Sequence, residues 1–151
     1  MNSPLRQQTA AARAALLDLH RVLLEAVRLE HERDHGRLGN AEMLRLVAFD
    51  PAFAWLRPVS ELIVALDELQ AMADVRDRDA AAVRFEIEDL LSRGEGPFPD
   101  RYLAVLQTSP DLVIAHSALQ RAIAALPSAR AEDVADLRTV RPGWKAPRRG
   151  R

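Results

Sequence analysis

The chain has 151 residues, a formal net charge of −1 and no cysteine. This length fits one domain, and hydrophobic residues make up 48% of the chain, enough to supply a core, which excludes a largely disordered protein. Without cysteine the chain has no disulfide framework, no thiolate metal site and no cysteine nucleophile. No stretch of about 18 uncharged apolar residues is present to span a membrane. The apolar run at residues 14–17 is too short for a secretory signal, which predicts a cytoplasmic protein.

A long first helix is indicated by apolar residues that recur every three or four positions. We expect it from about residue 9 to residue 35, where Gly36 ends it. Asn40 and Asp50 then suit N-caps, the first of a short helix over residues 41–49 and the second of the turn that follows it. The apolar stripe of the first helix consists of Leu16, Leu19, Leu23 and Val27, with Leu24 at its edge.

Three further long helices are expected over residues 58–75, 80–93 and 110–126, the last of them capped by Ser109. A short helix capped by Asp100 separates the last two. The pattern predicts an all-α fold, a helical bundle with about four long helices and short linking helices. It contains no alternation of period two that is long enough for a strand.

The small net charge hides an uneven distribution along the chain. Six basic residues and no acidic residue follow Asp136, so residues 1–137 carry a net charge of −7. We therefore expect a single helical-bundle domain over residues 1–137, with one more weak helix at residues 128–137, and a basic flexible tail over residues 138–151. The tail could bind nucleic acid by neutralising phosphates, with Trp144 stacking on a base, although the acidic domain would oppose this approach.

Residues 31–35 read His31-Glu32-Arg33-Asp34-His35 and match the H-E-x-x-H pattern. Histidines four positions apart lie on one helix face, so both could ligate one Zn²⁺ while Glu32 serves as general base on the metal-bound water. The segment resembles the zinc-binding helix of zinc metallopeptidases, which implies a zinc hydrolase. It departs from that family at Arg33 and Asp34, where charged residues replace uncharged ones. A solvated, charged helix end is the other interpretation, and zinc is an alternative rather than the expected cofactor.

The segment 49–58 contains three of the few aromatic residues. If Phe53 and Trp55 are exposed they form a partner-binding surface, and if they are buried they pack the short helices onto the bundle. Residues 49–64 look similar to a segment of small bacterial all-helical proteins of unknown function, and so do residues 110–116. This resemblance implies a bacterial helical domain and assigns no catalytic residue.

Two other histidines lie among leucines and valines on their helices. His20 and His116 could face each other inside the bundle as a pH-sensitive or ligand-binding pair. The alternative is that each is a hydrogen-bonded core residue with no partner histidine.

No phosphate-binding loop and no serine-nucleophile motif is present in the sequence. We therefore expect a non-enzymatic module that binds a protein partner or self-associates. The first alternative is a zinc hydrolase that uses His31, Glu32 and His35, and the second is nucleic-acid association through the basic tail. We expect no membrane association.

Overall fold

In a computed structural model of the chain, residues 3–93, 97–128 and 144 are described. These residues form an all-α fold without a strand, which confirms the predicted fold class. The expected number of long helices was too generous, because α1 has 32 residues whereas α6, α3 and α4 have 15, 14 and 12. In chain order the elements are α1 (Pro4–His35), α2 (Asn40–Phe49), the 3-10 helix η1 (Pro51–Leu56), α3 (Arg57–Gln70), α4 (Asp77–Glu88), the π-helical turn η2 (Asp89–Arg93), α5 (Phe98–Leu106) and α6 (Pro110–Ala124).

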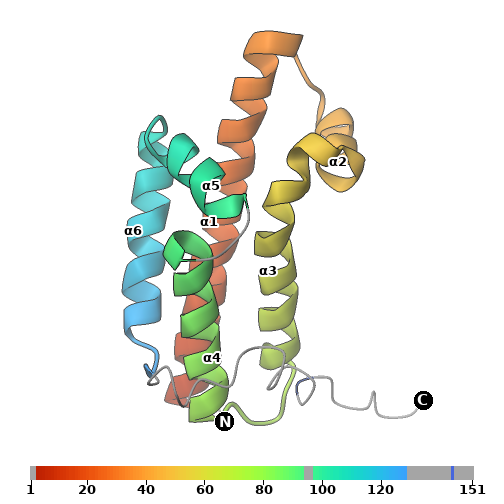
Figure 1. Cartoon of the computed structure of the whole chain (residues 1–151). Coiled ribbons are helices and arrows are strands. Elements are labelled where there is room, and N and C mark those ends of the chain that lie inside the picture. The colour runs from red at the N-terminus through yellow and green to blue at the C-terminus, as the bar shows by residue number, and fades with distance from the viewer. Residues whose placement is uncertain (1–2, 94–96, 129–143, 145–151) are drawn as a thin grey trace, which may run out of the picture.

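Helix α1 is the central element of the bundle. Figure 1 shows α3 and α6 running antiparallel to α1, with α4 in front of it and α2 at the outer edge. The leucine stripe that the sequence indicates is fully buried between these helices, and Val27 continues it. Removing such a buried leucine side chain costs about 2–5 kcal/mol of folding free energy, so this stripe is the main reason that α1 holds the bundle together. Its members are Leu16, Leu19, Leu23 and Val27.

Three helix boundaries agree with the local chemistry of the sequence. Asp50 Oδ1 accepts a hydrogen bond from the backbone N–H of Ala52 at 2.9 Å, and Ser109 Oγ accepts one from Leu112 at 3.2 Å. Gly36 ends α1 with a φ of +84°. Asp50 and Ser109 start helices because their side-chain oxygens accept from backbone N–H groups that the helix leaves unpaired. Gly36 ends a helix because it adopts a positive φ, which residues with a side chain disfavour.

Two predicted caps were wrong. Asn40 is the first residue of α2, and Gly39 occupies the N-cap position without a side-chain hydrogen bond. Asp100 lies inside the first turn of α5, which begins at Phe98. Phe98 is buried against the bundle, so packing extends this helix beyond the point at which its capping chemistry would begin it.

The ends of the long helices also differ from the prediction. Helix α1 begins at Pro4, because Ser3 Oγ accepts a hydrogen bond from the N–H of Arg6 at 3.2 Å. Helix α3 ends at Gln70, earlier than expected. Apolar periodicity predicted neither boundary. The first turn of α1 is mostly polar, and the end of α3 is fixed by a contact with α1, so neither leaves an apolar pattern in the sequence.

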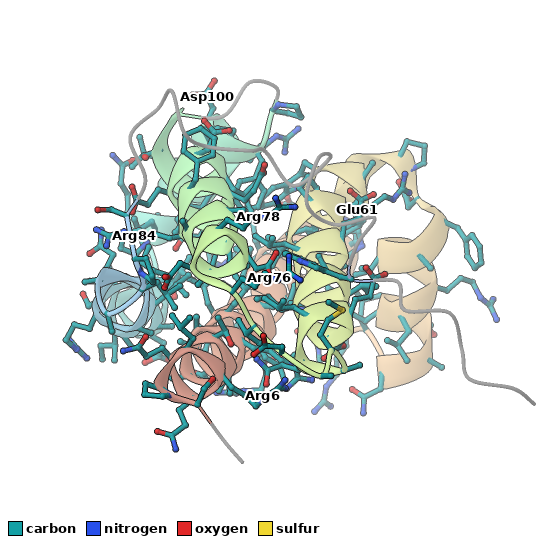
Figure 2. The ribbon with its side chains drawn as sticks, turned by 90° about the horizontal axis from the view of Figure 1, so that it is seen from below. Arg6, Glu61, Arg76, Arg78, Arg84 and Asp100 are labelled. Atoms are coloured by element: carbon teal, nitrogen blue, oxygen red, sulfur yellow. The ribbon has the colours of Figure 1, made fainter. Side chains whose placement is uncertain are left out.

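Two arginines tie helix ends to distant parts of the chain (Figure 2). Arg6 Nη1 donates to the carbonyl oxygen of Gln70 at 2.8 Å, and its Nη2 donates to that of Met72. Arg84 on α4 reaches across to the end of α6, where its Nη1 donates to the carbonyl oxygen of Leu126, just beyond that helix, at 2.8 Å. A cation at a helix C-terminus satisfies free carbonyls and complements the helix dipole. Both arginines therefore stabilise helix ends while holding two helices together.

Trp144 is the one described residue of the C-terminal segment. Its side chain is 3% exposed, and Nε1 donates a hydrogen bond to Asp79 Oδ1 at 2.9 Å. The other carboxylate oxygen of Asp79 accepts from the N–H of Arg76 at 3.1 Å, which caps α4. The ring that the sequence analysis placed in a flexible tail is thus buried in the core and is not free to stack on a base.

The other residues of the expected basic tail, and all but the first of the helix expected over residues 128–137, lie outside the described residues. Across the described part of the chain, no helix combines the length and apolar character needed to cross a membrane.

Candidate functional site

The end of α1 and the turn η1 meet at a pocket of about 300 Å³. His31 and His35 line this pocket together with Phe53 and Trp55, and the ring centroids of His31 and Phe53 are 5.5 Å apart. Arg101 of α5 contributes a basic side chain to the wall. The histidine motif and the aromatic segment, which the sequence presents as two separate candidates, are therefore one place in the fold.

His31 and His35 lie against each other as their spacing predicts. Their ring centroids are 4.3 Å apart with an angle of 13° between the ring planes, and His35 Nδ1 lies 3.3 Å from the carbonyl oxygen of His31. A zinc site needs at least a third protein ligand. Among the described residues, no group of three or more histidines and carboxylates is placed to hold a metal ion.

Glu32 is directed away from the two histidines. Its Oε2 accepts a hydrogen bond from the backbone N–H of Leu38 at 2.7 Å, while Arg28 Nη2 donates to the carbonyl oxygen of Leu38 at 3.2 Å. Glu32 and Arg28 thus hold both backbone groups of Leu38, in the loop that follows α1. The described lining of the histidine pocket does not include Glu32, so the structure does not bring the expected general base to the expected metal ligands.

Phe53 and Trp55 are 5% and 9% exposed, so their rings pack inward and do not form an exposed surface. The Trp55 ring centroid lies 5.8 Å from that of Phe98, which in turn lies 5.3 Å from that of Tyr102. These aromatic contacts join η1 to α5. Of the two interpretations of the aromatic segment, the structure supports packing.

The exposed apolar side chains of this region lie on α2 instead. Phe49 is 81% exposed and Leu44 is 70% exposed. With Ala41 and Ala48, which are also exposed, they lie on the outward side of α2, where Leu44 and Phe49 are about 140° apart and the exposed Arg45 lies between them. We call the four apolar residues the α2 stripe. The sequence shows the spacing of these apolar residues, but such spacing ordinarily predicts a buried helix face. Sequence reasoning therefore missed that these side chains are exposed.

His20 and His116 hydrogen-bond to different helices and not to each other. His20 Nε2 lies 3.3 Å from Ser60 Oγ on α3, and His116 Nδ1 lies 2.8 Å from Tyr102 Oη on α5. Burial lowers the pKa of both histidines below the usual 6.5 because it disfavours the charged imidazolium. The suggested facing pair is therefore wrong, and each ring is a neutral hydrogen-bonding group near pH 7.

In comparisons with known proteins, no family model, no curated protein and no solved structure matches this chain.

Proposed function

We propose that this protein is a self-associating helical module and that two copies meet through the α2 stripe. The observation that carries the proposal is the exposure of Phe49 and Leu44 on the outward side of a short helix. Large apolar side chains that share an exposed face are typical of protein interfaces, because covering them removes apolar area from water.

The position of α2 leaves this face accessible. Helix α2 packs mainly against η1, at the outer edge of the bundle (Figure 1). Met43 is the buried residue of α2 and marks its inner side. The stripe lies on the outer side, so it contributes little to packing within the described part of the bundle. Apolar side chains that contribute little to the fold are better explained by an interface.

A second copy of the chain suits this face in both charge and shape. Helix α2 has one acidic residue, Glu42, and one basic residue, Arg45, so its own residues carry no net charge toward a second copy. In an antiparallel pair around a twofold axis near the middle of α2, Ala41 of one copy lies opposite Ala48 of the other. Small side chains at these positions let two helices approach closely, while Leu44 and Phe49 supply the apolar area.

The expected dimer is weak. Helix α2 has 10 residues, which corresponds to a length of about 15 Å. Its single face is smaller than the roughly 800 Å² per partner of a standard stable interface. Association should therefore depend on protein concentration and should respond strongly to the loss of one large side chain.

Sedimentation equilibrium of the full chain at about 10 µM to 1 mM tests the proposal. The average mass should rise above the 16.8 kDa of one chain as concentration increases. Phe49→Ala should weaken the association at least about tenfold without affecting the fold, because most of the ring is in water. Ile114→Ala is the matched control, since Ile114 on α6 is 68% exposed and lies outside the stripe.

Two results would overturn self-association through α2. One is a parent protein that keeps the mass of a single chain at the highest concentration. The other is an equal loss of association in Ile114→Ala and Phe49→Ala, because the contact would then not depend on the stripe.

The two alternatives drawn from the sequence have less support. A zinc hydrolase needs Glu32 beside His31 and His35, whereas Glu32 is bonded to Leu38. Nucleic-acid association depends on basic residues outside the described part of the chain, and the Trp144 ring is buried.

A further inference from the structure

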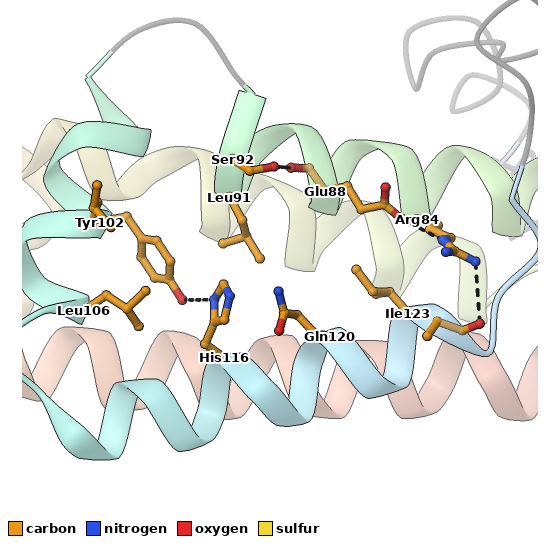
Figure 3. A pocket seen from close by; sticks show the side chains of 11 residues that line it. Arg84, Glu88, Leu91, Ser92, Tyr102, Leu106, His116, Gln120 and Ile123 are labelled. Carbon is orange, nitrogen blue, oxygen red and sulfur yellow. Dashed lines mark hydrogen bonds and ion pairs between the residues drawn. The ribbon is translucent and has the colours of Figure 1, made fainter.

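A second pocket, of about 570 Å³, lies between α4 with its continuation η2, α5 and α6 (Figure 3). Small-molecule sites commonly have volumes of about 300–1,000 Å³ and combine apolar walls with a few polar groups. Leu91, Leu106 and Ile123 supply apolar surface here, and His116 and Gln120 rise from α6 toward α4 and η2. The wall that they face includes a π-helical turn, a feature that is frequent at functional sites.

The hydrogen bond between Tyr102 and His116 determines what His116 presents to this pocket. Tyr102 is buried, and burial raises the pKa of its hydroxyl, which therefore keeps its proton. A buried hydroxyl needs an acceptor, and His116 Nδ1 lies 2.8 Å from Tyr102 Oη. When Tyr102 donates to Nδ1, the neutral imidazole has its own proton on Nε2. His116 is then a hydrogen-bond donor toward the pocket and not a general base.

The charges in the pocket wall are already paired. Arg84 Nε donates to Glu88 Oε1 at 2.6 Å, and Arg84 Nη1 donates to the carbonyl oxygen of Leu126. An anionic ligand would be repelled by Glu88, and a cationic ligand would compete with Arg84 for it. An uncharged ligand avoids both costs.

We propose that this pocket binds an uncharged small molecule with an amide group and an apolar ring or chain. The ligand carbonyl accepts a hydrogen bond from His116 Nε2, and the side-chain amide of Gln120 pairs with the ligand amide. The apolar part packs on Leu91, Leu106 and Ile123. Ligand binding in this pocket is separate from self-association, because none of the residues that line the pocket belongs to α2.

Three probes of nearly equal size and shape test the charge preference at pH 7.5: benzamide, benzoate and benzamidine. The ring signals of the histidines in an NMR titration of the full chain report binding, with the His116 signal assigned from the His116→Gln variant. Benzamide should shift the His116 signal to saturation, whereas anionic benzoate and cationic benzamidine should bind at least about tenfold more weakly. The His20 signal in the same spectrum is the internal control and should not move.

Two variants test the polar contacts without threatening the fold. Gln120→Leu should weaken benzamide binding at least about fivefold, whereas Gln107→Leu should not, since Gln107 is exposed and lies outside the pocket lining. Tyr102→Phe keeps the ring but leaves Nδ1 free, so it should also weaken binding. The proposal is overturned if the His116 signal does not move at the solubility limit of benzamide, if the three probes bind equally, or if Gln120→Leu binds like the parent.

Discussion

Glu32 shows that neighbouring residues on one helix can contact different parts of the structure. His31 and His35 are four positions apart and stack on one face, whereas Glu32 lies about 100° from His31 and about 60° from His35 around the helix. That rotation takes its carboxylate to the loop after α1, where the N–H of Leu38 lies 2.7 Å away. In this chain the glutamate of the H-E-x-x-H pattern is therefore a structural residue.

Replacing Glu32 tests this assignment. Glu32→Ala removes a charged acceptor from the Leu38 N–H, and we expect a loss of about 1–2 kcal/mol in the free energy of unfolding, measured by urea denaturation. Glu30→Ala, at a more exposed position on the same helix, should change it by less than about 0.5 kcal/mol. The hydrolase hypothesis predicts instead that Glu32→Ala keeps full stability and abolishes a zinc-dependent hydrolysis, and that pair of results would contradict our assignment.

Among the elements, the end of α1 depends most on a single backbone conformation. Gly36 has φ +84° and ψ 178°, a region of the backbone map that is almost restricted to glycine. Its N–H bonds to the carbonyl oxygen of Glu32 at 2.9 Å, which ends the helix and directs the chain toward Leu38. The direction of α2 and η1 relative to α1 follows from this turn.

Two glycine substitutions distinguish the cost of a positive φ from the cost of a steric clash with an added Cβ. A Cβ at Gly36 or at Gly39 would meet nothing within 4 Å, so neither substitution causes a clash. Gly36→Ala should lower the free energy of unfolding by about 1–3 kcal/mol because of its positive φ. Gly39→Ala should change it by less than about 0.5 kcal/mol, because Gly39 has an ordinary φ of −75°. Equal effects in a denaturant titration would show that the conformation of Gly36 is not the cause.

For the whole molecule, the contact between Trp144 and Asp79 joins positions 65 residues apart. Asp79 is 5% exposed and its carboxylate has two described hydrogen-bond donors, the Trp144 indole and the N–H of Arg76. A residue near the C-terminal end thus closes the bundle beside the start of α4. The stability of the domain should therefore depend on a residue that the charge pattern assigns to a tail.

Variants of Trp144 measure that dependence. Trp144→Ala should cost about 3–5 kcal/mol in the free energy of unfolding, because it empties a buried site and removes one of the two hydrogen-bond donors to the buried Asp79 carboxylate. Trp144→Phe should cost less, about 1–3 kcal/mol, because a ring still fills most of the site. Phe49→Ala is the control at an exposed aromatic residue and should change stability by less than about 0.5 kcal/mol. A Trp144→Ala protein as stable as the parent would contradict the contact.

The amino-acid sequence by itself determined the helical class, the buried stripe of α1 and the caps at Asp50 and Ser109, because these depend on residues within a few positions of one another. Tertiary structure decided where each face points: it buried Phe53 and Trp55, exposed Phe49 and turned Glu32 away from the histidines. It also brought Tyr102 to His116 and Trp144 to Asp79. Such contacts join separate elements, and their formation depends on how the whole bundle packs, so no local pattern in the sequence records them.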